Sequence, residues 1–269
     1  MDMPFDSGWK DILAEHIRTS VERSGNNGVV LGLSGGLDSA VVLALAVKAL
    51  GPENVHAVLM PYDDSPSEDM SHARDYARHT GVKMEEVVIG DIVDAVTQNS
   101  IGGGGMAEAN VHARIRMVLL YYMANSHSLL VMGTSNKTEL MIGYFTKYGD
   151  GGADLCPIGD LYKTQVRKMA VELGVPEAII NKKPSAGLPG VAGDEEEIGY
   201  MYPDIDKMLY GMELGWDDER IAESTNMSID AVKDLRNMVC RSRHKRGLGM
   251  VPKIGIKTVG LDLREDRSC

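Results

Sequence analysis

The sequence has few cysteines, few aromatic residues and no long apolar run. Its three cysteines, Cys156, Cys240 and Cys269, are far apart and form no Cys-x-x-Cys pair, which argues against a zinc or dithiol site. Widely spaced cysteines in an odd number fit a reducing compartment, so we expect a cytoplasmic protein. Residues 1–4 lack the basic and apolar stretches of a signal peptide. No apolar run approaches the roughly 20 residues of a membrane span, so we expect no membrane partner.

Positive charge is also scarce. The 28 Lys and Arg residues face 39 Asp and Glu residues, which gives a net charge of −11. A general nucleic-acid binder is more often basic, so we expect no nucleic-acid partner. An anionic small ligand would need a local basic cluster, and residues 241–246 hold the strongest one. That cluster is either a phosphate or carboxylate site or a solvated patch.

The 269 residues, 43 % of them hydrophobic, suffice for one large α/β domain. Apolar runs typical of buried strands alternate with helical patterns, and this alternation predicts a doubly wound parallel sheet flanked by helices. We expect strands at 29–33, 55–60, 84–89 and 129–132 and helices at 9–21, 40–50, 66–80, 91–98, 107–125 and 164–173, with further helices from 194 to about 242.

A polar, glycine-containing stretch, Ser34-Gly35-Gly36-Leu37-Asp38-Ser39, joins the first expected strand to the next helix. A helix N-terminus after a tight turn offers free backbone N–H groups to an anion, and adjacent glycines let a ligand approach the backbone. Asp38 fits beside a phosphate if a divalent cation lies between them. The alternative is an ordinary turn capped by Ser34, but two serines and an acid exceed what a cap needs.

This stretch lacks the Gly-Lys-Ser/Thr ending of a Walker A loop and the spacing of the dinucleotide-binding glycine turn. It resembles instead the SGGxDS loop of the PP-loop ATP pyrophosphatases, which cleave ATP between its α and β phosphates and adenylate a carboxylate or carbonyl oxygen. The resemblance implies the adenine nucleotide alpha hydrolase-like fold and ATP as a substrate. It leaves the acceptor open.

Three further features are ambiguous when taken from the residues alone. Glu139 follows the fourth expected strand and is either a second carboxylate beside Asp38 on Mg²⁺ or a solvated helical residue. Lys163 opens a helix, where a cation is electrostatically disfavoured, so it either neutralises a nearby phosphate or is simply solvated. Arg114 and Arg116 are two residues apart on a helix and face different sides, so one is expected to bind a ligand and the other to serve the structure.

Several separate blocks resemble the ammonia-dependent NAD synthetases, and they cover residues 31–245 in the expected order. Beyond the glycine-containing stretch, the blocks are residues 110–116, 133–139, 143–154, 157–164, 183–188 and 244–246. The block at 143–154 is the most diagnostic, because other PP-loop enzymes lack it. Its 12 residues belong to an 18-residue stretch, 143–160, that has no helical or strand pattern and is long for a passive loop.

The resemblance implies a role for each matching residue. Asp38 and Glu139 would bind Mg²⁺, Asp150 would receive ammonia, and Asp150 and Lys163 would be catalytic. Ser185 replaces a threonine of many relatives but keeps the hydroxyl, and His112 replaces a glutamine or lysine, which leaves its role open. The positions implied for ATP are Gly32, Leu33, Ser34, Gly35, Gly36, Leu37, Asp38, Ser39, Thr134, Lys163 and Ser185. The positions implied for deamido-NAD are Arg114, Lys147, Asp154, His244 and Lys245.

The implied activity is ATP-dependent amidation of deamido-NAD by ammonia, the last step of NAD biosynthesis. The products are NAD, AMP and pyrophosphate, formed through an acyl-adenylate. We expect a single synthetase domain over residues 1–269, without the amidohydrolase domain of glutamine-dependent relatives, so ammonia would be free or come from a separate subunit. Relatives are homodimers, and the helix at 107–125 is a candidate either for that interface or for the core.

Two other interpretations compete with this one. The chain would also suit another PP-loop enzyme, such as a GMP synthetase core or a tRNA-modifying enzyme, although the thiolating members often need paired cysteines. Residues 217–232 have the pattern of a helix-turn-helix, which would indicate a DNA-binding regulator. Asp230 and Asp234 on its second helix would repel a phosphate backbone, so we favour a helix pair packed beside the substrate site.

Overall fold

A parallel four-stranded sheet lies at the centre of the protein. The structure, a computed structural model, describes residues 2–62, 67–99, 103–182, 193–247, 249 and 251–258. The strands are β1 (Gly28–Gly32), β2 (Val55–Leu59), β3 (Lys83–Glu86) and β4 (Leu129–Met132), in the spatial order β3-β2-β1-β4. All three neighbouring pairs are parallel, which confirms the expected fold class.

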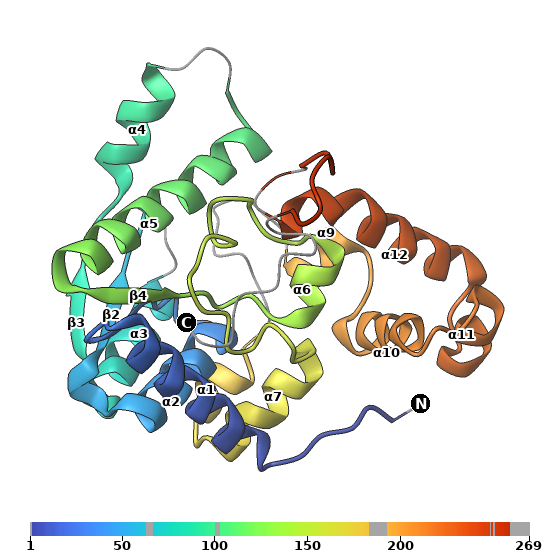
Figure 1. The fold of residues 1–269 in the computed structure, drawn as a ribbon, viewed down its shortest axis with the longest axis horizontal. Coiled ribbons are helices and arrows are strands. Elements are labelled where there is room, and N and C mark those ends of the chain that lie inside the picture. The colour runs from blue at the N-terminus through green and yellow to red at the C-terminus, as the bar shows by residue number, and fades with distance from the viewer. Residues whose placement is uncertain are drawn as a thin grey trace.

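Helices cover both faces of the sheet (Figure 1). One face packs against α4 (Gly90–Gln98) and α5 (Met106–His127). The other face packs against α1 (Trp9–Ser24), α2 (Leu37–Leu50), α3 (Ser67–Thr80), α7 (Lys163–Glu172) and α8 (Glu177–Ile180), with the short 3₁₀ turn η1 (Pro52–Asn54) after α2. Because both faces are covered, β1 and β4 are apolar throughout and β2 nearly so, as a buried parallel sheet requires, whereas the edge strand β3 carries three charged residues.

A second apolar core lies beside the sheet and is built by helices of the last quarter of the chain (Figure 1). We call α10 (Tyr202–Glu213), α11 (Asp218–Thr225) and α12 (Ile229–Arg241) the C-terminal module. The helix pair expected from residues 217–232 forms α11 and α12, and α12 buries Val232 and Leu235 against this core. The remaining elements are α6 (Lys137–Ile142), α9 (Asp194–Ile198) and η2 (Ser242–Arg246).

Some predicted boundaries were wrong. The third strand ends at Glu86 and not at 89, because its partner β2 ends at Leu59 and Pro61 has no N–H with which to continue the ladder. The helix after β1 begins at Leu37 and not at 40, so Asp38 and Ser39 lie in its first turn. The start of the helix predicted at 66–80 lies outside the described residues.

The topology determines where a ligand can bind. The connection after β1 leads to β2 on one side of β1, whereas β4 pairs with β1 on the other side. The crevice between the carboxyl ends of β1 and β4 is therefore the switch point of the sheet. The loops at 33–36 and 133–136 both open there. In the part of the chain that the structure describes, no helix is long and apolar enough to cross a membrane.

Candidate active site

The loop after β1 is folded tightly by its own residues. We call residues 32–39 the phosphate loop. Gly35 has a φ of +77°, and a Cβ there would lie 2.2 Å from the backbone oxygen of Asp69, so only glycine fits. The Ser34 hydroxyl accepts the Gly36 N–H at 3.2 Å, and the Ser39 hydroxyl donates to the Gly36 oxygen at 3.0 Å. The two serines therefore hold the backbone of the loop in place.

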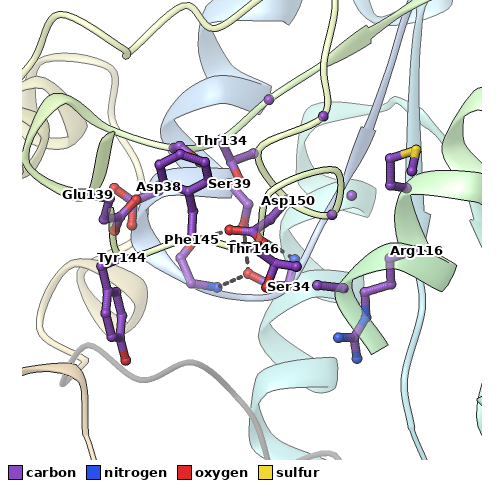
Figure 2. Close-up of a pocket in the computed structure, with 18 of the residues that line it drawn as sticks. Ser34, Asp38, Ser39, Arg116, Thr134, Glu139, Tyr144, Phe145, Thr146 and Asp150 are labelled. Carbon is purple, nitrogen blue, oxygen red and sulfur yellow. Dashed lines mark hydrogen bonds between the residues drawn. The ribbon is translucent and has the colours of Figure 1, made fainter. Parts of the chain in front are cut away.

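Asp38, Glu139 and Lys163 meet at one end of this loop, and we call them the ionic cluster. The Lys163 Nζ lies 2.5 Å from Asp38 Oδ2 and 3.2 Å from Glu139 Oε1. The side chain of Asp38 is only 17 % exposed, that of Glu139 14 % and that of Lys163 6 %. Figure 2 shows the two carboxylates side by side. Lys163 lies 125 positions from Asp38 and 24 positions from Glu139 in the sequence, so the fold brings distant residues into one buried group.

Asn136 ties this cluster together, although the sequence analysis gave it no role. Its side-chain nitrogen donates to Asp38 Oδ1 at 3.0 Å, and its side-chain oxygen accepts the Glu139 N–H at 3.0 Å. The Asn136 N–H in turn donates to Glu139 Oε2 at 3.2 Å, which completes a capping box at the start of α6. One fully buried amide therefore orients both carboxylates.

The charges of the cluster depend on one another. Burial lowers the pKa of Lys163, but the carboxylates of Asp38 and Glu139 outweigh burial and raise that pKa above its ordinary value. Burial, together with the neighbouring Asp38 carboxylate, raises the pKa of Glu139 despite the opposing ammonium of Lys163. The ammonium is therefore what allows two carboxylates to share this site.

The donor set of the cluster fits a magnesium ion. Carboxylate oxygens are the ligands that Mg²⁺ prefers, and it is usually held by one or two carboxylates together with water and substrate phosphates. Among the described residues, no group of three or more His, Cys, Asp or Glu side chains could hold a metal by itself. The pair Asp38 and Glu139 therefore suits an ion that arrives with a phosphate, and does not suit a fully protein-bound metal.

The cluster borders a cavity of about 650 Å³. Most of the residues predicted for ATP, magnesium and ammonia line it, but four of the five predicted for deamido-NAD do not. The lining residues from those predictions are Gly32, Leu33, Ser34, Gly36, Leu37, Asp38, Ser39, Thr134, Glu139, Asp150, Lys163 and Lys245. Gly35, Arg114, Lys147, Asp154 and His244 are not among the lining residues, and Ser185 lies outside the described residues.

Asp150 lies on the wall of this cavity, in the irregular stretch 143–160. Its Oδ1 accepts the Thr146 N–H at 2.9 Å (Figure 2). Partial desolvation by the surrounding protein raises the pKa of Asp150, although the backbone hydrogen bonds from Thr146 and the Lys245 ammonium oppose this. The carboxylate therefore faces the same space as the phosphate loop and has an increased affinity for a proton.

Three of the remaining predicted residues form an exposed basic strip outside the cavity. Arg114 Nε donates to the Lys147 oxygen at 3.4 Å, and Lys147 Nζ donates to the His244 oxygen at 2.6 Å. The strip thereby joins α5, the irregular stretch and η2. Asp154 lies elsewhere: its carboxylate accepts the Val131 N–H at 2.8 Å and the Tyr121 hydroxyl at 3.0 Å, which fastens the stretch to β4.

Arg116 and Asp194 line the cavity although neither was assigned to the site. Arg116, one of the two arginines on α5, donates from Nε to the Met60 oxygen at 3.1 Å, whereas Arg114 is exposed. Asp194 is 5 % exposed and contacts the hydroxyls of Tyr144 and Tyr202 at 3.3 Å each. Spacing on the helix signalled that one arginine faces inward, but Asp194 begins an acidic run that is typical of a solvated helix.

His112 is buried away from the cavity. Its side chain is 5 % exposed, and its ring centre lies 4.4 Å from that of Tyr62. Burial lowers the pKa of His112, which favours the neutral imidazole. The histidine therefore packs from α5 against Tyr62 and is not among the residues that line the cavity.

These observations define the class of the protein. A doubly wound parallel sheet, a tight Gly-Ser loop at its switch point and a buried lysine between two carboxylates are the features of a PP-loop enzyme that uses ATP. Residues 10–249 match the family model of NAD synthase. Within the PP-loop class, the chain therefore belongs to the NAD synthase family. The family is one of ligases that form carbon–nitrogen bonds, as the resemblance implied.

Individual relatives agree with this family. The chain is 48 % identical over 245 residues to the NH(3)-dependent NAD(+) synthetase of Archaeoglobus fulgidus. The aligned region covers 90 % of this chain and 95 % of that protein. Among solved structures it is similar to an NMN synthetase from Francisella tularensis, with a TM-score of 0.82, 33 % identity and coverage of 93 % and 99 %. It is also similar to an NH3-dependent NAD synthetase from Campylobacter jejuni, with a TM-score of 0.80, 32 % identity and coverage of 93 % and 100 %.

Proposed function

We propose that this protein amidates the nicotinate carboxylate of deamido-NAD with ammonia and ATP, and releases NAD, AMP and pyrophosphate. This is the last step of NAD biosynthesis. The observation that carries the proposal is the ionic cluster, in which Lys163 joins Asp38 and Glu139 beside the phosphate loop and inside the large cavity. Membership of the NAD synthase family and the 48 % identity to an NH(3)-dependent NAD(+) synthetase support the choice of substrates.

The first chemical step needs charge to be neutralised at the phosphates. The nicotinate carboxylate attacks the α phosphorus of ATP, the bond to the bridging oxygen breaks, and pyrophosphate leaves. The N–H groups of the phosphate loop and the ammonium of Lys163 would stabilise the charge that develops on the leaving group. Mg²⁺ held by Asp38 and Glu139 would supply further neutralisation of the same phosphates.

The second step needs ammonia in its neutral form. Ammonia attacks the carbonyl carbon of the acyl-adenylate, and AMP leaves. Asp150 lines the same cavity as the phosphate loop and has a raised pKa, so its carboxylate suits a role in binding ammonium and accepting a proton from it. The side chain is held in place by the Thr146 N–H.

The dinucleotide must reach the cavity from outside. Lys245 lines the cavity and donates to the Gly143 and Phe145 oxygens, so it fixes the rim. The basic strip formed by Arg114, Lys147 and His244 lies at the surface, where it would bind the phosphates of the part of deamido-NAD that does not react. Asp154 is also proposed to contact deamido-NAD, and Ser185 is proposed to contact ATP.

A smaller substrate is the second candidate. The likeness to an NMN synthetase, at a TM-score of 0.82 and 33 % identity, favours nicotinate mononucleotide as an acceptor with the same reacting carboxylate. The two candidates differ in the adenylate half that only deamido-NAD has. Contacts to the surface strip would therefore favour the dinucleotide.

The protein would act as a homodimer in the cytoplasm. Val118 and Tyr122, one turn apart on α5, are 54 % and 74 % exposed, and Ile92 on the adjoining α4 is 36 % exposed. This apolar face would bury itself in a homodimer. Cys156 and Cys240 are unpaired, which supports a reducing, cytoplasmic compartment.

The test is a reaction of purified protein with ATP, Mg²⁺, ammonium and either deamido-NAD or nicotinate mononucleotide. We expect NAD and AMP in equal amounts, a higher kcat/KM for the dinucleotide, and no product when a chelator removes the metal. Glutamine in place of ammonium should give no product if the chain lacks an amidohydrolase. Formation of ADP in place of AMP would refute the proposal.

A further inference from the structure

Asp206 is a fully buried carboxylate that belongs to the C-terminal module and not to the cavity. It lies on α10 and has no exposed surface. Burying a carboxylate costs free energy unless its oxygens are well satisfied. Burial accordingly raises the pKa of Asp206, and hydrogen bonds from two threonines oppose that rise. The hydrogen-bond partners of Asp206 indicate why a carboxylate is buried at this position.

Asp206 accepts one hydrogen bond on each oxygen, and the two donors lie on different helices. Its Oδ1 accepts the Thr138 hydroxyl of α6 at 2.6 Å, and its Oδ2 accepts the Thr164 N–H of α7 at 2.8 Å. The Thr138 hydroxyl also accepts the Lys163 N–H at 2.9 Å. The first two N–H groups of α7 are thus satisfied by Thr138 and Asp206, and not by the segment before the helix.

These helices are the ones that carry two members of the ionic cluster. Thr138 immediately precedes Glu139 on α6, and Lys163 is the first residue of α7. Both helices contact α10, and Figure 1 shows α6 and α7 lying between the sheet and the C-terminal module. The position of each charged side chain therefore depends on a backbone that Asp206 holds.

The charge of Asp206 also resolves an electrostatic conflict. A lysine at a helix N-terminus faces the positive end of the helix dipole, which disfavours it. A carboxylate that binds the N–H groups of the same first turn offsets that dipole. Lys163 can then remain at the start of α7 with its ammonium directed at Asp38 and Glu139.

We propose that Asp206 is a positioning residue for the reaction, which acts through Thr138 and the first turn of α7 to set Lys163 against Glu139. The inference rests on the proposed function, because it assumes that the ionic cluster binds the phosphates of ATP and their metal. The C-terminal module thereby gains a role, because its residue Asp206 anchors the two helices that carry Glu139 and Lys163.

The test compares Asp206→Asn with Asp204→Asn on the same helix. The Asp204 side chain is partly exposed and makes no hydrogen bond or ion pair with the rest of the described chain, so its variant is the matched control. An asparagine at 206 has one oxygen and one NH₂ group, so it cannot accept from both donors. We expect MgATP to bind about tenfold more weakly and kcat to fall about 10²-fold, since small displacements of reacting groups have effects of that size. The Asp204 variant should match the wild type.

The melting temperature of each variant is measured first, and calorimetric binding of MgATP and the rate of AMP formation are then measured below that temperature. An Asp206→Asn protein that melts earlier but binds MgATP and turns over like the wild type overturns the inference. If that variant does not fold, Thr138→Val and Thr138→Ser decide: the serine should restore MgATP binding and kcat, and equal behaviour of the two overturns the inference. A wild type that binds MgATP but forms no AMP refutes only the proposed function.

Discussion

At the scale of single residues, Lys163 has the largest expected effect on both stability and rate. Its ammonium compensates Asp38 and Glu139 in a site where little water remains. Lys163→Met should lower the free energy of unfolding by about 3–5 kcal/mol, because it leaves two buried carboxylates without their counter-charge. It should also lower kcat by about 10²–10³-fold, the usual effect of removing a group that stabilises developing charge.

Denaturant unfolding and the rate of AMP formation measure these effects. Added Mg²⁺ should raise the melting temperature of Lys163→Met more than that of the wild type, because the metal replaces the missing positive charge. Lys83→Met is the control, since the Lys83 side chain is 52 % exposed and pairs with Glu85 at the surface. An equal response to Mg²⁺ in Lys163→Met and in the wild type would argue against metal binding by the two carboxylates.

Asp150 should separate the two chemical steps. Asp150→Asn keeps the size of the side chain but removes the proton acceptor, so it should cripple amidation while pyrophosphate release in the first step continues. The wild-type amidation rate should fall as the pH is lowered through the raised pKa of Asp150, because the protonated acid cannot accept a proton. The variant should lose this acidic limb. Pyrophosphate and NAD are assayed together, and equal loss of both would contradict the assigned role.

Some residues of the candidate site were indicated by a local pattern. Asp38 stands inside a recognisable loop, and Glu139 and Lys163 lie in blocks that resemble one family. Asn136, Asp194 and Asp206 could not be predicted, because their functions depend on partners that lie up to 98 residues away and on burial that no local pattern shows. The sequence also left open which of two arginines on α5 faces the cavity.

At the scale of elements, the phosphate loop depends on one left-handed residue. Gly35→Ala must accept a φ of +77°, which costs a residue with a side chain about 1–2 kcal/mol, and must also move the backbone of Asp69, which a Cβ would approach to 2.2 Å. Gly174→Ala is a matched control, because its φ is +69° and nothing lies within 4 Å of the added carbon.

The two glycine variants therefore separate the cost of a left-handed backbone from the cost of a steric clash between the added Cβ and Asp69. Both should lose stability in thermal unfolding, but Gly35→Ala should lose more, and only Gly35→Ala should weaken MgATP binding in calorimetry. If Gly174→Ala lost as much stability and affinity, the close approach of Asp69 to the loop would have no role.

The elements themselves were largely predictable, and their ends were less so. Alternation of apolar strands and helical patterns is a local property, so the parallel sheet was correctly expected. The end of β3 depends on Pro61, which belongs to the partner side of the ladder, and so the prediction extended too far. The irregular stretch 143–160 was recognised by its lack of pattern, but its attachment to β4 through the Gly133 N–H and the Leu155 oxygen, 2.7 Å apart, required the structure.

At the scale of the whole molecule, an acidic chain binds two anionic nucleotides only through local charge. The net charge is −11, yet Lys163, Arg116 and Lys245 all line one cavity. The sheet supplies the phosphate loop, and the second core holds the helices that carry the opposing charges. The candidate active site therefore lies where these two cores meet, which explains why blocks from residue 31 to residue 245 were needed to indicate a substrate.

The exposed apolar face of α4 and α5 gives a prediction about assembly. Val118 and Tyr122 lie one turn apart and are 54 % and 74 % exposed, so Tyr122→Glu would bring a charge into the centre of the proposed interface. Sedimentation should show a wild-type dimer and a monomeric Tyr122→Glu protein. Val171→Glu is the control, because Val171 is 64 % exposed on α7, which packs against the opposite face of the sheet. A dimer that persists in Tyr122→Glu but dissociates in Val171→Glu would place the interface on the other side of the molecule.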